Sequence, residues 1–188
     1  EMFFEDAAVV SRELGLTLTS RSGDVNKNPM CGVPYHAVDG YLAKLVAKGY
    51  RVAIAEQIGD PKAKGLTKRE VVKVVTPGTI LEEGALKAAQ NNYIALIYEQ
   101  DKELVLAGAD ISTGECFYGI YKGTDSLQVL CDELYRLMLP EILILGQLSQ
   151  RQELEKFVKL RLEHCIFTEI AEPAKEIDNL IVQHFDIN

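Results

Sequence analysis

Residues 93–121 read YIALIYEQDKELVLAGADISTGECFYGIY, and this stretch decides the fold of the larger part of the chain. It holds three runs rich in apolar, β-branched and aromatic residues, at 93–99, 103–111 and 115–121. Short polar turns separate the runs, as they do in consecutive β-hairpins. We therefore predict three antiparallel strands in a meander.

The residues after the meander predict helices and strands in alternation. Leucines from Leu127 to Leu137 recur at the period of an amphipathic helix, which Pro140 would close. The further predicted elements are a strand at 142–145, a helix opened by a capping box at 149–152, and a strand near 161–168. The order βββαβαβ is that of the ribonuclease H-like fold, which we expect for residues 91–188. Another apolar pattern begins at Ile177, so we expect the final helix of this domain to be incomplete.

Residues 1–78 predict a smaller, mixed α/β unit. Apolar residues from Phe3 to Leu14 form a helical stripe that Gly15 would end. The later predicted elements are a short strand at 16–21, a long loop at 22–36, a helix at 37–48, and strands at 51–55 and 71–75. Residues 79–90 would link this unit to the second one, so we predict a two-domain chain of the α/β class.

The net charge of -8 hides a difference between the two halves of the chain. Residues 1–78 contain eleven Lys and Arg against nine Asp and Glu, whereas residues 79–188 contain nine against nineteen. Affinity for DNA depends on cations that neutralise phosphates, so only the first half is suited to face a nucleic acid. The second half is more typical of an interaction or connector module.

Composition excludes several other classes of protein. The apolar fraction of 47% and the charged fraction of 26% are those of a folded globular chain. No run approaches the roughly 18 apolar residues that a membrane span needs, so we expect no membrane association. The cysteines show no zinc-type spacing, and we interpret Cys31, Cys116, Cys131 and Cys165 as reduced, mostly packing thiols of a cytoplasmic protein.

Because the ribonuclease H-like fold hosts many nucleases, the second half must be tested for a metal site. Two-metal cleavage requires several converging carboxylates. The predicted first strand offers only Glu99, the first helix offers Asp132 and Glu133, and the fourth strand ends without an acid. Asp110 is better interpreted as an acid that binds backbone at a turn. We therefore predict no catalytic residue and no metal site, with a metal-dependent nuclease as the rival hypothesis.

Several short sequence motifs occur in a fixed order along the chain. They are EMFFEDA at 1–7, PMCGVPYHA at 29–37, YLAKLV at 41–46, AIAEQIGDP at 53–61 and VVTPGT at 74–79, followed by DISTG at 110–114. At these separations the first five resemble the bacterial MutS family of DNA mismatch-recognition proteins, and the sixth resembles the connector domain of that family. The resemblance implies that residues 1–78 are a mismatch-recognition domain and residues 91–188 a connector domain.

The family reads mismatches with a Phe-x-Glu motif, and Glu1 aligns with its glutamate. The phenylalanine, which wedges against the mispaired base from the minor groove, would lie two residues before Glu1, and we expect impaired discrimination where it is missing. Such a wedge costs roughly a few kcal/mol of unstacking, least where pairing is already defective. Because a carboxylate among phosphates is repelled, we hypothesise that Glu1 accepts a hydrogen bond from a base N–H or acts as the neutral acid, and that its charge penalises normal duplex. Without the resemblance, Glu1 would only complement a helix dipole.

The resemblance also implies contacts with the DNA backbone. Arg21 and Arg69 align with arginines of the family and Lys68 lies beside Arg69, so these cations would contact phosphates, which positions the protein without reading sequence. Met30 aligns with a methionine near the minor groove, with packing on the core as the alternative. Without the resemblance, the cations would form an ordinary solvated surface. We interpret Tyr35 as structural.

Intact members of the family are implied to carry lever, clamp and ATPase domains, to form homodimers, to bind ATP and magnesium, and to signal to the partner MutL. This chain contains no Gly-x-x-x-x-Gly-Lys-[Ser/Thr] phosphate loop, so we expect neither an ATPase activity nor a cofactor in it. The implied function is recognition and binding of mismatched double-stranded DNA. A protein-interaction module without a DNA role is the second alternative, favoured by the acidic total charge.

Overall fold

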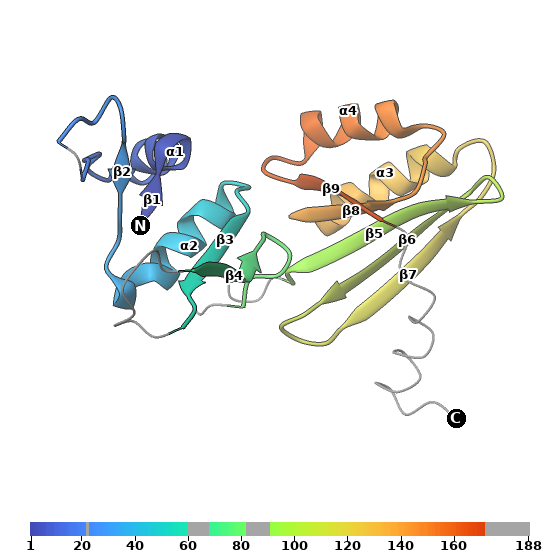
Figure 1. Cartoon of the computed structure of the whole chain (residues 1–188). Helices are drawn as coiled ribbons and strands as arrows, with labels where there is room; N and C mark the ends of the chain where they lie inside the picture. The colour runs from blue at the N-terminus through green and yellow to red at the C-terminus, as the bar shows by residue number, and fades with distance from the viewer. Residues whose placement is uncertain (22, 60–67, 82–90, 172–188) are drawn as a thin grey trace.

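The computed structural model describes residues 1–21, 23–59, 68–81 and 91–171. They form a smaller α/β unit, which comes first in the sequence, and a larger α/β unit, which lies beside it in Figure 1. The smaller unit consists of β1 (Met2–Phe3), α1 (Phe4–Leu14), β2 (Met30–Cys31), the 3-10 turn η1 (Tyr35–Ala37), α2 (Val38–Ala47), β3 (Val52–Gln57) and β4 (Arg69–Val75). The larger unit consists of β5 (Tyr93–Gln100), β6 (Glu103–Asp110), β7 (Cys116–Tyr121), α3 (Ser126–Leu137), β8 (Glu141–Leu145), α4 (Arg151–Arg161) and β9 (Ile166–Ile170). Among the described residues, no helix has the length and apolarity to cross a bilayer.

The larger unit is built on a five-stranded sheet with the strand order β7-β6-β5-β8-β9. β6 pairs antiparallel with β5 and β7, whereas β8 pairs parallel with β5 and β9. α3 and α4 lie over one face of this sheet (Figure 1). Ile97 pairs with Leu106 on one side and Ile144 on the other, and each is at most 1% exposed. Burial of one such side chain contributes about 1.5–3 kcal/mol. The predicted order βββαβαβ is confirmed.

The ends of several elements differ from the sequence prediction. The predicted capping box is wrong, because α4 begins at Arg151 without a side-chain cap. Ser149 instead donates from its backbone nitrogen at 2.7 Å and its hydroxyl at 2.9 Å to the carboxylate of Glu99. α3 likewise follows Asp125 without a side-chain cap. The last strand starts later than predicted, because α4 continues to Arg161.

The smaller unit packs around a small core between α1 and its neighbours. α1 ends at Gly15, as predicted, and the positive φ of 67° there suits glycine. The strand predicted at 16–21 is wrong, since within it only Thr19 pairs, as an isolated bridge to Met30. The described strands of this unit form two separate antiparallel pairs, β1-β2 and β3-β4. The buried residues around α1 are Ala7, Val10, Cys31 and Leu45.

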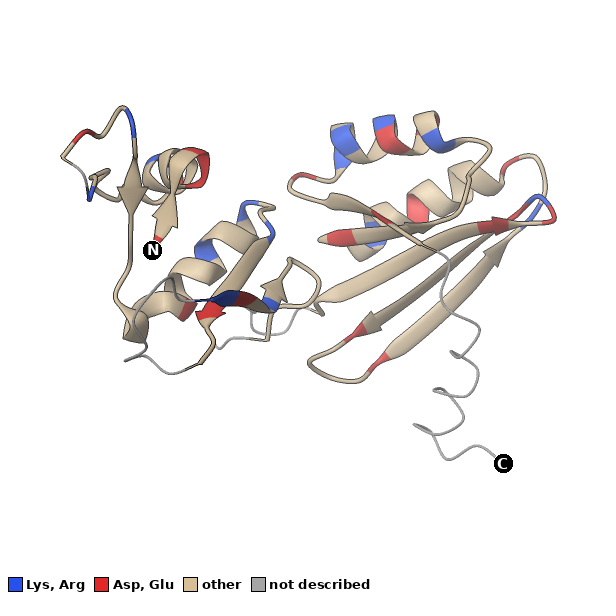
Figure 2. Cartoon of the chain, viewed as in Figure 1, with Lys and Arg blue, Asp and Glu red and all other residues tan. Residues whose placement is uncertain are grey.

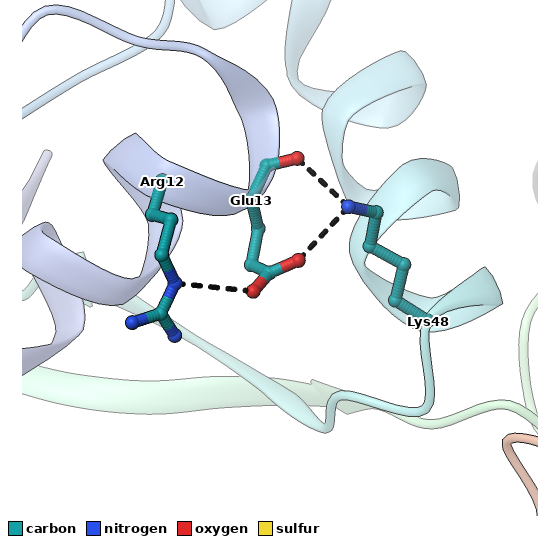
Figure 3. Close-up of polar contacts among 3 residues, drawn as sticks. All are labelled: Arg12, Glu13 and Lys48. Carbon is teal, nitrogen blue, oxygen red and sulfur yellow. Dashed lines mark hydrogen bonds and ion pairs between the residues drawn. The ribbon is translucent and has the colours of Figure 1, made fainter.

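An ion pair ties the two helices of the smaller unit together (Figure 3). Lys48, just after α2, donates to the backbone carbonyl oxygen of Glu13 at 3.0 Å and to its carboxylate at 2.9 Å. The hydrogen bond from Lys48 lowers the pKa of the Glu13 carboxyl, and this effect outweighs the opposing effect of burial. Arg12 approaches the same carboxylate at 3.5 Å. These contacts fix the last turn of α1 and therefore the start of the segment that leads to Arg21.

A buried carboxylate joins the two units. Glu141, at the start of β8, is 2% exposed. It accepts hydrogen bonds from the Thr76 hydroxyl at 2.5 Å and from the backbone nitrogen of Gly78 at 3.1 Å. A buried charge is tolerated only when it is hydrogen-bonded, so the turn after β4 must stay seated against β8. We call Thr76, Gly78 and Glu141 the joint.

Asp110 braces the turn between β6 and β7. Its carboxylate accepts hydrogen bonds from the backbone nitrogens of Asn92 at 2.8 Å, Ser112 at 2.8 Å and Thr113 at 3.3 Å, and from the Ser112 hydroxyl at 2.5 Å. Burial alone would raise the pKa of Asp110, but these hydrogen bonds outweigh burial and hold the pKa below its usual value. The interpretation of Asp110 as a turn acid is confirmed.

The other acids considered for a metal site also have local partners. Glu99, Asp132 and Glu133 each accept a hydrogen bond from a nearby residue. Within the described ranges, no three side chains of His, Cys, Asp or Glu are grouped closely enough to hold a metal ion.

Replacement of Gly78 by alanine should loosen the joint. The added Cβ would lie 2.8 Å from the Cβ of Ile94 and 3.1 Å from the Glu141 side chain, so the surroundings must shift. We expect a loss of about 1–3 kcal/mol in the free energy of unfolding, measured by urea titration. Gly40→Ala is the matched control, because nothing lies within 4 Å of its added atom and alanine favours a helix by about 0.5–1 kcal/mol. Equal stability of the two variants would contradict close packing at the joint.

Asp110→Asn should destabilise the fold in a pH-dependent way. Because the pKa of Asp110 is lowered on folding, its ionised form stabilises the protein above the unfolded pKa of about 3.9, and this contribution is lost as pH falls through the folded pKa. We expect a loss of about 1–3 kcal/mol at about pH 7 that shrinks below about pH 4. Urea titrations at both pH values measure this, and the exposed Asp132→Asn serves as control. A pH-independent loss for Asp110→Asn would argue against the ionised turn acid.

Candidate nucleic-acid interface

The first residues of the chain and the segment after α1 meet at one edge of the smaller unit. Glu1 immediately precedes β1, in which Phe3 pairs with Met30 of β2. On the chain that follows α1, Thr19 pairs with the same Met30. These pairings bring Arg21, two residues beyond Thr19, to the edge that carries Glu1. We call Glu1, Phe3, Arg21 and Met30 the recognition edge.

Arg21 and Glu1 form a close ion pair at the recognition edge. The Nη2 atom of Arg21 donates to both carboxylate oxygens of Glu1, each at 2.7 Å. The two side chains are 64% and 45% exposed, so the pair is open to solvent. The guanidinium carbon also lies 5.7 Å from the centre of the Phe3 ring, which adds a cation–π contact.

The surroundings of Glu1 favour its ionised form. The hydrogen bond from Arg21 lowers the pKa of the Glu1 carboxyl, and this outweighs the opposing effect of burial. The positive charges of Arg21 and Arg69 act in the same direction. In the absence of DNA, Glu1 is therefore paired with an arginine that favours its ionised form.

Met30 lies in β2 rather than in the continuous loop predicted at 22–36, which is a correction to that prediction. Its backbone nitrogen donates to the carbonyl oxygen of Thr19 at 2.8 Å, and its own carbonyl oxygen accepts from Thr19 at 2.7 Å. The side chain is half-buried. Strand pairing therefore fixes the position of Met30, and part of its side chain stays accessible beside Phe3.

Arg69 is the first residue of β4 and Lys68 immediately precedes it, and both are exposed. The Lys68 ammonium pairs with Glu70 at 2.5 Å, which ties it to its own strand. Arg69 differs, since its charge contributes to the lowered pKa of Glu1. The structure thus brings Glu1 and Arg21 into contact, whereas Arg69 acts on Glu1 through its charge alone. In Figure 2 the ribbon of this unit is coloured for further Lys and Arg positions along α2 and β4.

Sequence reasoning missed Phe3 as part of this edge. It placed Phe3 on the apolar stripe of a helix, whereas the structure places it in β1, half-buried beneath the guanidinium of Arg21. The available signal was the two-residue spacing of Glu1 and Phe3, which puts both side chains on one face of a strand. A strand of only two residues is too short for that alternation to stand out.

Tyr35 differs from its predicted structural role. It lies at the start of η1 and is 89% exposed, so its ring does not pack into the core. Sequence could not separate the two outcomes, because tyrosine combines an apolar ring with a polar hydroxyl and suits either environment.

One pocket of the described residues lies away from the recognition edge. It has a volume of about 890 Å³ and is bordered by α2, β7 and α3. None of the five predicted DNA-binding residues lines it. Burial in a deep pocket therefore does not define the candidate site, which is an exposed, charged edge.

Comparison with known proteins gives concordant matches. Residues 1–84 match the family described as MutS domain I. The chain is similar to the DNA mismatch repair protein MutS of Pelotomaculum thermopropionicum, with 49% identity over 145 residues, covering 77% of this chain and 17% of that protein. It is 41% identical over 191 residues to the MutS of Ruminiclostridium cellulolyticum, covering 99% of this chain and 22% of that protein. With the MutS of Listeria monocytogenes it shares 42% identity over 193 residues, covering 100% of this chain and 22% of that protein.

The chain spans about a fifth of the length of these curated relatives. The match to MutS domain I includes all five predicted DNA-binding residues, which are Glu1, Arg21, Met30, Lys68 and Arg69. Identity with the relatives extends through the larger unit as well, since two of the three alignments cover at least 99% of the chain. The chain therefore belongs to the MutS family of DNA mismatch repair proteins.

Proposed function

We propose that this chain recognises and binds mismatched double-stranded DNA as part of a longer DNA mismatch repair protein. The observation that carries the proposal is the recognition edge, where the carboxylate of Glu1 is held beside Arg21 within the segment that matches MutS domain I. Mismatch reading requires a group that probes a base and cations that hold the DNA backbone nearby. Both kinds of group meet at this edge.

Each of the two units has its own role in this proposal. In our proposal residues 1–78 form the mismatch-recognition domain, residues 79–90 a linker and residues 91–188 a connector domain. The strand order β7-β6-β5-β8-β9, in which the first strand of the unit is central, supports a ribonuclease H-like assignment for the connector. The acidic balance of the second half supports a role away from the phosphate backbone.

At the DNA, the proposed contacts divide into positioning and reading. Arg21, Lys68 and Arg69 neutralise phosphates, and Met30 lies against the minor groove. Glu1 accepts a hydrogen bond from a base N–H, or donates one when it is protonated. In normal duplex no base is displaced to meet it, so its charge only adds repulsion from the phosphates. A mispaired base is cheaper to displace, and this difference in deformation energy provides the discrimination.

The connector domain would pass the bound state of the DNA to the rest of the protein. We propose that the joint transmits the structural change caused by DNA binding, because Glu141 ties β8 to the end of the strand that begins at Arg69. The full-length protein would carry lever, clamp and ATPase parts, bind ATP and magnesium there, form a homodimer and signal to MutL, in the bacterial cytoplasm at the nucleoid. The chain itself would bind DNA without catalysing a reaction.

Glu1→Gln in the full-length protein should weaken discrimination more than affinity. Gln keeps the shape but removes the charge that penalises matched duplex and the acid that can be protonated at a mispair. We expect the ratio of affinities for G·T-containing and matched duplex to fall by about 10-fold, the worth of one hydrogen bond to a charged group. Fluorescence anisotropy at one fixed salt concentration measures both affinities. An equal loss on the two duplexes would contradict the reading role of Glu1.

Arg69→Gln should weaken binding to both duplexes alike. A phosphate contact carries no sequence information, and its removal should make the slope of log K against log salt shallower by about 0.9. Anisotropy titrations over a range of salt concentrations give this slope. Lys122→Gln is the control, since Lys122 pairs with Glu103 in the larger unit at 2.8 Å. An unchanged slope for Arg69→Gln would remove this residue from the phosphate contacts.

A further inference from the structure

One arginine serves two roles that conflict at the recognition edge. Arg21 donates through Nη2 to both oxygens of Glu1 in the protein without DNA. The proposed function, on which this inference rests, requires the same guanidinium at a phosphate and the same carboxylate at a base. The pair with Glu1 occupies Nη2 and offsets the charge of Arg21, so it weakens the attraction of this guanidinium for a phosphate and leaves only Nη1 and Nε as donors.

The geometry favours exchange of the partner of Arg21. The ion pair is exposed on both sides, and exposed ion pairs contribute little to stability, so its loss costs little. A phosphate offers the guanidinium charge-assisted, bidentate hydrogen bonds. Phe3 contacts the guanidinium through its ring and not through a hydrogen bond, so this support can persist while the acceptor changes. The backbone of Arg21 lies just beyond the Thr19–Met30 bridge, which holds the segment in place during the exchange.

We propose that Arg21 is a positioning residue that releases Glu1 when it binds a DNA phosphate. The carboxylate of Glu1 would thus become free to contact a base only after the DNA backbone has bound to Arg21. In the protein without DNA, Arg21 compensates the charge of Glu1 and keeps it ionised. On matched duplex the released carboxylate has no partner and weakens binding. At a mispair a base N–H, or a proton taken up by Glu1, replaces the arginine.

A double-mutant cycle in the full-length protein tests the exchange. The variants are Glu1→Gln, Arg21→Gln and the double variant, each measured on matched and G·T-containing duplex at one salt concentration. Glu1→Gln removes both the phosphate repulsion and the competitor for Arg21, so we expect about a 2- to 5-fold gain in affinity for matched duplex when Arg21 is present. With Arg21→Gln only the repulsion is relieved, and the gain should fall to less than about half of that.

The possible outcomes separate the inference from the proposed function. Equal gains with and without Arg21 would overturn the exchange, because they would show repulsion alone. A loss on matched duplex with Glu1→Gln would also overturn it, since Glu1 would then hold Arg21 in place for its phosphate instead of competing with that phosphate. Absence of any preference of the unaltered protein for G·T duplex would overturn the proposed function, while the matched-duplex cycle would still decide the exchange.

Two controls complete the test. Glu5→Gln makes the same charge change at an exposed position in the first turn of α1, and it should show the same effect with and without Arg21. Thermal unfolding of each variant checks the fold, which should be unchanged because the ion pair is solvent-exposed. Coupling between Glu5 and Arg21 as large as that of Glu1 would indicate a general charge effect and overturn the specific exchange.

Discussion

A buried carboxylate is central to the contact between the smaller unit and the larger one. Glu141 lies at the start of a core strand and is almost fully buried, and the turn after β4 supplies hydrogen bonds to its carboxylate. Arg51 adds a more exposed contact to Thr168 at 3.4 Å. β4 continues from this turn to Arg69, a span of about 20 Å for seven residues in a strand. One hydrogen-bonded acid therefore anchors the end of the strand that begins at Arg69.

Sequence periodicity predicted the larger unit well because its pattern is local. Strands β5 and β6 alternate buried and half-buried residues, which makes their two-residue period visible in the chain. The capping box failed for a physical reason, since Glu99, fifty residues earlier, offers Ser149 a charged acceptor that competes with the helix end. The strand expected at 16–21 failed because its pairing surface is a two-residue strand, and a partner that short supports only one bridge.

For the candidate site, sequence supplied the residue types but not their contacts. The resemblance identified Glu1, Arg21 and Arg69 as separate points of contact with DNA. It did not predict that Glu1 and Arg21 bind each other, because that contact arises from strand pairing around Met30. Side-chain contacts between residues twenty positions apart depend on such tertiary pairing and leave no periodic trace in the chain.

The two units also differ in how much apolar surface stabilises them. The core of the larger unit contains fifteen buried residues, whereas each of the two clusters in the smaller unit contains four among the residues described. Free energies of local opening follow buried contacts, so amide protons around β1 and β2 should exchange with solvent through openings far less costly than those of β5 and β6. The recognition edge thus belongs to the less stable part of the molecule, and binding of a duplex to its folded form would stabilise that part against local opening.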